Sequence, residues 1–245
     1  MLKSTDSYRF RLFPALGYTP TLSATAMSDA HESRNLFLEG PAGRLEAILW
    51  KPLSTAPPSA AALLCHPHPL FGGTMHNKVV YQVAKTLDRL GLPVLRFNFR
   101  GADLSAGTHD RGRGEQDDVR AALDFLAAEF SGVPQLLAGF SFGAWVGLRA
   151  GCADERVAQL IGLGTPVNSS DFSYLQNCAK PKLFVHGSKD EHGAVEKLKA
   201  LVRLLPGENR LVVVDGADHF FVGKLDQVDR AIASWLINRH HELRG

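Results

Sequence analysis

The sequence predicts an α/β domain with a mainly parallel central sheet. Apolar segments of strand length alternate along the chain with amphipathic segments of helical period, and the links between them are short. Continuous apolar runs, such as residues 60–65, are typical of strands buried on both faces of a parallel sheet. No internal repeat and no long linker interrupts this alternation, so we expect a single domain over residues 31–245.

The expected strands are runs of apolar and β-branched residues bounded by turn residues. The first two flank the turn Gly40-Pro41-Ala42-Gly43, which predicts a hairpin. The expected strands cover residues 35–38, 45–50, 60–65, 92–99, 134–138, 160–163, 183–186 and 211–214.

The expected helices show apolar residues at intervals of three and four, as at Val79, Val80, Val83 and Leu87. They cover residues 79–90, 119–130, 144–148, 195–205 and 225–236. Open α/β sheets bind ligands at the carboxyl ends of their strands. Functional side chains are therefore expected in the segments that directly follow strands.

The composition is that of an ordinary globular protein. Of its 245 residues, 45% are hydrophobic and 21% are charged, and the formal net charge is +2. This weak charge predicts neither a nucleic-acid nor a membrane partner, and no apolar run approaches the roughly 20 residues that span a bilayer. The cysteines Cys65, Cys152 and Cys178 are interpreted as reduced thiols of a cytoplasmic protein.

Residues 1–30 differ from the rest of the chain. Basic residues precede a Pro- and Thr-rich stretch without helical or alternating period, and the apolar core of a secretory signal is missing. We interpret residues 1–30 as a disordered N-terminal extension, with a transit peptide as the alternative. A translation start at Met27 would leave a complete domain, so residues 1–26 are expected to be dispensable.

The most informative segment is Gly139-Phe140-Ser141-Phe142-Gly143. It connects an expected strand to an expected helix, and G-x-S-x-G in that context is typical of a nucleophile elbow. The tight turn exposes the serine and brings backbone segments so close that neighbouring positions tolerate only glycine. We therefore interpret Ser141 as a catalytic nucleophile.

A serine hydroxyl needs a base, and the base needs an orienting acid. The elbow predicts the chain order Ser, then Asp or Glu, then His. Asp190 follows the strand at 183–186, and His219 follows the strand at 211–214, so they complete that order. Glu191 is the alternative acid because it adjoins Asp190.

Other candidates fit the pattern less well. Asp215 and Asp218 are too close to His219 in sequence to be the expected orienting acid. His186 is interpreted as a structural hydrogen-bonding residue, and His192 lies in polar surroundings.

The loop after the strand at 60–65 is expected to supply part of the oxyanion hole. It contains Gly72 and Gly73, which permit close approach of the backbone to a ligand, whereas its prolines have no N–H to donate. We expect the backbone N–H of Phe71 or Leu70 to act together with that of Phe142.

Two alternative sites are weaker. His66 and His68 have the spacing of half a metal site, but no third ligand with a carboxylate lies nearby in sequence. The glycine- and arginine-rich loop 101–114 lacks the order of phosphate-binding motifs, so it is interpreted as supporting the site from behind. We expect no metal and no organic cofactor.

The motifs together resemble the α/β-hydrolase superfamily over about residues 35–239. The resemblance rests on the segments GFSFG (139–143), HGSKD (186–190) and GADHF (216–220). The segments CHPHPLFGGTMHNKVV (65–80) and FNFRG (97–101) resemble more narrowly a subgroup of small bacterial serine hydrolases without a lid. The resemblance implies a three-layer α/β-hydrolase fold with Ser141 as nucleophile, Asp190 as acid and His219 as base.

One segment departs from that pattern. A G-x-S-type loop is usual after FRG in the subgroup, whereas Ala102-Asp103-Leu104-Ser105 stands here. The departure leaves the shape of the neighbouring pocket wall open.

Only residues 165–180 separate the expected strands at 160–163 and 183–186, which is too short a stretch for a cap domain. We expect an open site whose walls bind substrate through five aromatic side chains: Phe71, Phe140, Phe142, Phe172 and Phe220.

The expected function is that of a serine hydrolase, a carboxylesterase, which cleaves esters or thioesters of a small-molecule acyl substrate. A peptidase or a short-chain polyester depolymerase could use the same three residues. A non-catalytic ligand receptor on the same fold is the alternative from another class.

Overall fold

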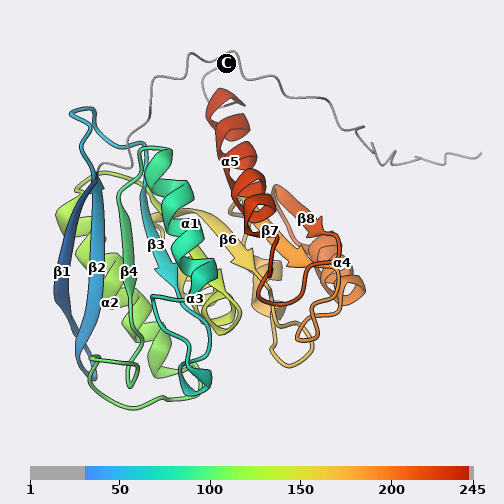
Figure 1. Ribbon diagram of the computed structural model, residues 1–245, viewed down its shortest axis with the longest axis horizontal. Coiled ribbons are helices and arrows are strands. Elements are labelled where there is room, and N and C mark those ends of the chain that lie inside the picture. The colour runs from blue at the N-terminus through green and yellow to red at the C-terminus, as the bar shows by residue number, and fades with distance from the viewer. Residues whose placement is uncertain (1–30, 243–245) are drawn as a thin grey trace, which may run out of the picture.

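The computed structural model of the chain describes residues 31–242. The expected extension over residues 1–30, and its dispensability, lie outside the described residues. The described chain forms an eight-stranded sheet in the order β1-β2-β4-β3-β5-β6-β7-β8 (Figure 1). This is the predicted class, an α/β fold with a mainly parallel sheet.

An antiparallel hairpin forms one side of the sheet. β1 (His31–Gly40) pairs with β2 (Gly43–Pro52), and Gly40 stands opposite Gly43 at the predicted turn. β2 also runs antiparallel to β4 (Val94–Phe97). The hairpin therefore extends a sheet whose remaining strands all run in one direction.

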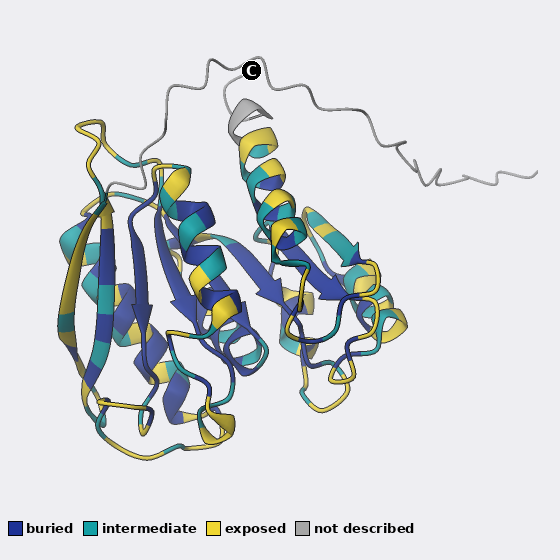
Figure 2. Cartoon of the chain, in the orientation of Figure 1, coloured by how far each residue is buried: buried dark blue, intermediate teal, exposed yellow. Residues whose placement is uncertain are grey.

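The parallel part of the sheet contains β4 and five further strands. They are β3 (Ala61–Cys65), β5 (Gln135–Phe140), β6 (Val157–Leu163), β7 (Lys182–Gly187) and β8 (Asn209–Val214). Every residue of β3, β5 and β7 is buried, as the continuous apolar runs predict (Figure 2). The carboxyl ends of these strands meet at one edge, the lower edge in Figure 1.

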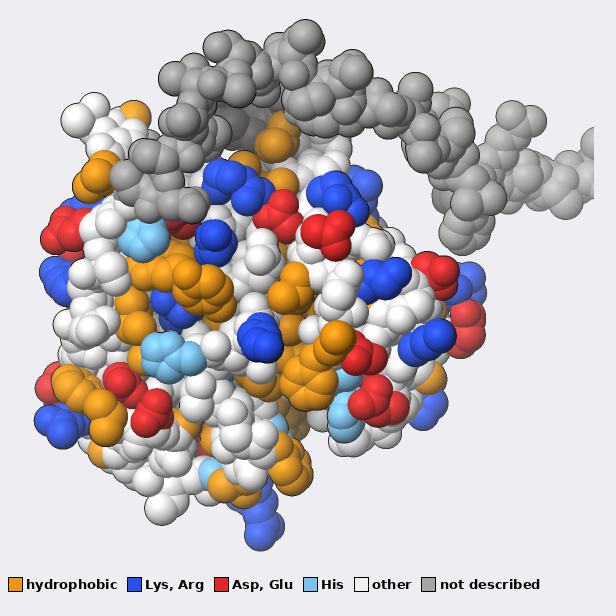
Figure 3. Space-filling view, in the orientation of Figure 1, with side chains coloured by type: hydrophobic (Ala, Val, Ile, Leu, Met, Phe, Trp, Pro, Cys, Tyr) orange, Lys and Arg blue, Asp and Glu red, His pale blue; other side chains and the backbone are white. Residues whose placement is uncertain are grey.

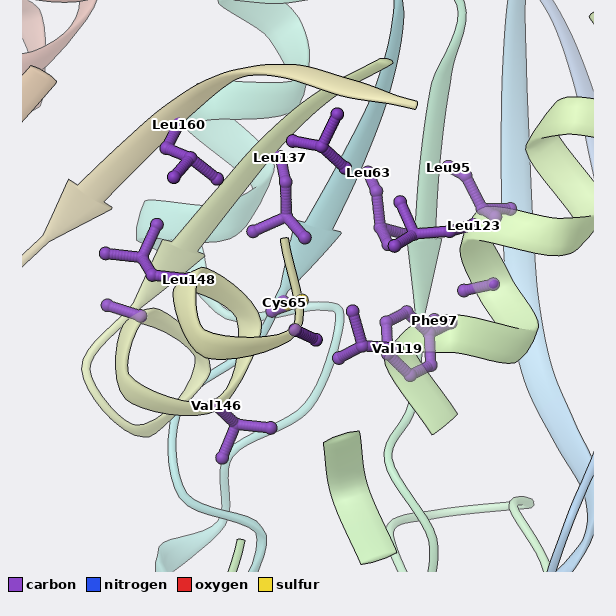
Figure 4. Packing of buried hydrophobic residues seen from close by; sticks show 14 of the residues in the cluster. Leu63, Cys65, Leu95, Phe97, Val119, Leu123, Leu137, Val146, Leu148 and Leu160 are labelled. Atoms are coloured by element: carbon purple, nitrogen blue, oxygen red, sulfur yellow. The ribbon is translucent and has the colours of Figure 1, made fainter. Parts of the chain in front are cut away.

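Helices cover both faces of the sheet. α1 (Lys78–Arg89) and α5 (Leu225–Glu242) pack on one face, and the other face carries α2 (Gly114–Glu129), α3 (Phe142–Ala153) and α4 (Val195–Leu204). Each face has its own apolar core. The core on the face of α2, α3 and α4 includes Leu63 and Phe97 of the sheet and Val119 and Leu123 of α2 (Figure 4). These two layers of side chains hold the strand ends, and hence the segments that follow them, in fixed positions.

The connection between β6 and β7 contains only the short 3₁₀ helix η2 (Ser173–Asn177). Within residues 31–242, no cap domain covers the carboxyl edge of the sheet, as the short spacing predicts. A second 3₁₀ helix, η1 (Pro69–Phe71), lies in the loop after β3. No helix in the described part of the chain has the length and apolarity needed to cross a membrane.

The cysteines correct one expectation. Cys152, near the end of α3, and Cys178, after η2, form a disulfide with their Cα atoms 5.6 Å apart, so the interpretation as three reduced thiols is wrong for this pair. The pairing arises because η2 packs on α3, where the Tyr174 hydroxyl donates a hydrogen bond of 3.0 Å to the Trp145 carbonyl. Their separation of 26 residues carried no signal of this contact. Cys65 is a free, buried thiol.

Candidate active site

Ser141 occupies the sharp turn between β5 and α3. Its φ of 56° and ψ of −118° place it in a backbone conformation that L-residues rarely adopt, directly before the first residue of α3. A Cβ at Gly139 would overlap the backbone of Gly143, and one at Gly143 would overlap the carbonyl group of Cys65. The two glycines of the motif are therefore required by close packing of the backbone.

The structure brings His219 and Asp190 to this serine. His219 Nε2 lies 2.9 Å from Ser141 Oγ, and His219 Nδ1 lies 2.8 Å from Asp190 Oδ2. An ionised carboxylate can only accept, so Nδ1 donates to Asp190 and Nε2 is left to accept the serine proton. His219 and Asp190 are 3% and 7% exposed, so little water competes for these hydrogen bonds.

Asp190 is the acid that the geometry selects. Burial opposes ionisation of Asp190, but the hydrogen bond from His219, the neighbouring imidazoles and the backbone N–H of His192 outweigh it and lower its pKa. Glu191 instead lies 3.7 Å from Nε2 of His192, at the surface.

The two other acids considered in the sequence are engaged elsewhere. Asp215 accepts a hydrogen bond of 3.2 Å from the Ser188 hydroxyl, and Asp218 accepts one of 3.0 Å from the backbone N–H of Val222.

The expected second oxyanion donors are already used. The N–H of Phe71 donates to the carbonyl oxygen of His68 at 3.1 Å, and the N–H of Leu70 donates to Nδ1 of His68 at 3.3 Å. The expectation for Leu70 and Phe71 is therefore not supported, because the 3₁₀ turn consumes both donors. Within residues 31–242, the N–H groups of His68 and Phe142 have no acceptor.

The side chains of His66 and His186 serve the fold. His66 Nδ1 donates to the carbonyl oxygen of Pro67 at 2.6 Å, and Nε2 accepts the N–H of Phe99 at 2.9 Å. Both ring nitrogens are engaged, which counts against His66 as a metal ligand. Burial lowers the pKa of His66 to about 4. His186 Nε2 lies 2.6 Å from the Gly193 carbonyl oxygen, as expected of a structural hydrogen-bonding residue.

A cavity of about 460 Å³ opens beside Ser141 and His219. Of the five aromatic side chains expected in its wall, Phe71, Phe142 and Phe220 line it. Phe140 and Phe172 do not, so the expectation is wrong for these two.

The two phenylalanines that do not line the cavity, Phe140 and Phe172, are buried in the protein. Phe140 is buried and packs against the ring of His219, with their centroids 5.0 Å apart. Phe172 is buried in the apolar core on the face of the sheet that carries α2, α3 and α4. Hydrophobicity alone does not distinguish a side chain of the core from one of the pocket.

Several other side chains of the wall were not predicted from the sequence. They are His68, Asn77, His109, Arg111, Trp145, Ser169, Ser170 and His192. The loop 101–114, which was expected behind the site, contributes two of them to the pocket. It directly follows β4, so the rule that ligands bind at strand ends was the available signal. Hydrophobic, histidine and basic side chains gather at this edge of the molecule, at the bottom of Figure 3.

Comparisons with known proteins identify relatives of this chain. Residues 59–233 match the model of a family described as "Alpha/beta hydrolase domain". The chain is 37% identical over 219 residues to an uncharacterized protein of Rickettsia prowazekii, covering 84% of this chain and 91% of that protein.

Two solved structures are also similar. An alpha-beta serine hydrolase homologue from Coxiella burnetii has 41% identity and a TM-score of 0.78, covering 83% of this chain and 97% of that chain. A serine hydrolase without lid from Xanthomonas campestris has 38% identity and a TM-score of 0.77, covering 83% and 95%.

Proposed function

Because the chain belongs to the alpha/beta hydrolase domain family, we propose that it is a serine hydrolase that cleaves carboxylic esters or thioesters through a covalent acyl-enzyme. The observation that carries the proposal is the hydrogen-bonded series Ser141, His219 and Asp190, with distances of 2.9 and 2.8 Å. A receptor that does not catalyse would have no need of this arrangement.

In the proposed reaction, Ser141 Oγ attacks the substrate carbonyl while His219 Nε2 accepts the hydroxyl proton. The bond to the leaving group breaks, and His219 returns the proton to the departing oxygen or sulfur. A water molecule then attacks the carbonyl carbon of the acyl-enzyme while His219 accepts its proton. The bond to Ser141 Oγ breaks, and His219 returns the proton to this oxygen. Asp190 keeps Nδ1 protonated and stabilises the imidazolium that forms in each half-reaction.

Backbone donors are needed where negative charge develops on the carbonyl oxygen. The N–H of Phe142 begins α3, where the helix dipole also favours an anion. We assign the second donor to the N–H of His68 in place of Leu70 or Phe71. The rings of His68 and Phe142 are in contact, with centroids 4.8 Å apart, so the two residues lie side by side at the pocket.

The substrate is proposed to be a small or extended acyl compound. The cavity has the volume of a small-molecule site, and no cap closes it within the described residues. The side chain of Phe71 is 87% exposed at its mouth, which leaves an apolar surface for an acyl or alcohol group.

Covalent labelling tests the proposal. A fluorophosphonate probe should modify Ser141, identified by mass spectrometry of the digested protein, and Ser141→Ala should lower turnover of p-nitrophenyl esters by about 10⁵–10⁶-fold. A panel of p-nitrophenyl esters and acyl thioesters of increasing length would define the acyl group. Labelling of another residue, or undiminished hydrolysis by Ser141→Ala, would contradict the proposed function.

A further inference from the structure

Arg111 lies in the wall of the pocket and has no acidic partner within residues 31–242. It belongs to the loop between β4 and α2, and its side chain is exposed. In the part of the chain that the structure describes, no acidic side chain pairs with its guanidinium. A cation in this position is available to a ligand in the pocket.

The backbone around Arg111 is held firmly. The buried carboxylate of Glu115 accepts the N–H groups of Asp110 and Gly112 at 2.7 and 2.8 Å, and it lies 2.8 Å from Nδ1 of His109. A Cβ at Gly112 would overlap the ring of Trp145, so the loop also packs tightly against α3. Arg111 itself has a φ of 52°, an unfavourable conformation for arginine that these contacts impose.

The ionisable side chains in and beside the pocket wall favour binding of an anion. The described wall contains Arg111 and four histidines but neither Asp nor Glu. Three carboxylates beside the wall are engaged: Glu115 with its loop, Asp190 with His219, and Asp110 with the N–H of Gly114 at 3.0 Å. Arginine binds carboxylate and phosphate groups with charge-assisted hydrogen bonds.

The same wall also has an apolar part. Phe142 and Trp145 are in edge contact, with ring centroids 6.0 Å apart, and both line the pocket together with Phe71. A ligand can thus place an apolar body against these rings and a charged end toward the loop.

We propose that Arg111 makes this enzyme selective for esters or thioesters that carry an anionic group, a carboxylate or a phosphate, on the acyl or the leaving side. The proposal rests on the proposed function and names the substrate class of the same site. Arg111 binds the anionic group and takes no part in the chemistry at Ser141.

The test compares matched anionic and neutral esters. On the acyl side, p-nitrophenyl hemiglutarate is compared with p-nitrophenyl pentanoate. On the leaving side, 4-acetoxyphenylacetate is compared with its methyl ester, and 4-acetoxybenzyl phosphate replaces the carboxylate by a phosphate. The readout is the ratio of kcat/KM for the anionic substrate to that for the neutral one, after subtraction of spontaneous hydrolysis. The pair with the highest ratio identifies the side and the kind of anion.

Three variants isolate Arg111. Arg111→Gln should lower the ratio about tenfold, mainly through KM, and Arg111→Lys should retain part of it. Arg113→Gln is the matched control, because Arg113 is exposed, lies two residues away and does not line the pocket. The wild-type ratio should also fall with rising salt concentration. If Arg111→Gln does not fold, Arg111→Asn replaces it, since asparagine tolerates a positive φ.

The outcomes separate the two proposals. The role of Arg111 is overturned, and the proposed function is kept, in two cases. In the first, neutral esters are hydrolysed and the ratio of anionic to neutral kcat/KM is the same in Arg111→Gln and Arg113→Gln. In the second, the wild type prefers neutral substrates. Absence of both ester hydrolysis and fluorophosphonate labelling in the wild type removes the proposed function, and the role of Arg111 with it. Labelling of Ser141 in each variant shows that its site is assembled.

Discussion

Oδ1 of Asp190 accepts a hydrogen bond of 2.9 Å from the backbone N–H of His192, while its Oδ2 lies 2.8 Å from Nδ1 of His219. The loop after β7 thus orients the carboxylate through one oxygen and leaves the other for the imidazole. Glu191, its neighbour in sequence, takes no part in this arrangement and points its carboxylate toward the exposed His192.

Exchange of each acid for its amide should therefore have unequal effects. Asp190→Asn should lower kcat on a p-nitrophenyl ester by about 10⁴-fold, because an amide no longer holds His219 in the tautomer that accepts the serine proton. Glu191→Gln is the matched control and should change kcat less than twofold. Equal losses in the two variants, measured by initial rates at neutral pH, would disprove the assignment of the acid.

The strands and helices, and the three side chains that meet at the proposed site, were predictable because they depend on local patterns. Apolar runs mark the strands, and the chain order of Ser141, Asp190 and His219 follows from the elbow motif. The start of α2 was not predictable in this way. It begins at Gly114 rather than at 119, because polar contacts hold its first turn: the carboxylate of Glu115 accepts the N–H groups of Asp110 and Gly112 at 2.7 and 2.8 Å, and hydrophobic periodicity cannot detect such contacts.

The wall of the pocket depends on side-chain direction, which the sequence does not contain. Phe140 and Phe142 flank the same serine, yet one packs behind His219 and the other lines the cavity. Side chains alternate between the two faces of the sheet along a strand, but follow the period of 3.6 residues in a helix. Phe140 ends β5 and Phe142 begins α3, so the direction of one does not predict that of the other. Only the assembled fold distinguishes them.

The buried His66 should make the protein less stable in weak acid. Burial lowers its pKa to about 4 in the folded state, against 6.5 as the ordinary value. Between these values the unfolded chain binds a proton that the folded chain does not, so the free energy of unfolding should decrease as pH falls from 6.5 toward 4. The full shift corresponds to about 3 kcal/mol.

Chemical denaturation at several pH values measures this effect. His66→Gln should show a flatter decrease than the wild type over that interval, whereas His76→Gln, which changes an exposed histidine, should follow the wild type. Burial also lowers the pKa of His186, so this residue adds to the decrease in stability in all three proteins. Its contribution cancels when their slopes are compared. Identical slopes for the wild type and His66→Gln would contradict the prediction.

The disulfide between Cys152 and Cys178 predicts both the reactivity of the thiols and the stability of the fold. In denatured, unreduced protein, iodoacetamide should label Cys65 alone, and prior reduction should allow all three cysteines to react. Replacement of both paired cysteines by serine should lower the free energy of unfolding by about 3 kcal/mol, since a crosslink restricts the unfolded chain.

A reducing agent should destabilise the wild type and leave the double-serine variant unaffected. Labelling of three thiols without reduction, measured by mass spectrometry, would show that the pair is not joined. A disulfide is unusual in a reducing cytoplasm, so the same measurement on protein prepared directly from cells bears on the expected cytoplasmic location.

The backbone N–H of His68 can be removed by a single substitution. His68 has a φ of −57°, which lies within the range that proline adopts, so His68→Pro deletes the N–H without requiring a new φ. His68→Ala keeps the N–H and removes only the imidazole, which includes the acceptor for Leu70 N–H. If the N–H of His68 stabilises the oxyanion, kcat of His68→Pro should lie about 10²–10³-fold below that of His68→Ala, with both proteins still labelled by the fluorophosphonate. Similar kcat values for the two variants would show that any decrease in kcat comes from loss of the His68 side chain alone. The second oxyanion donor would then be another group of the loop.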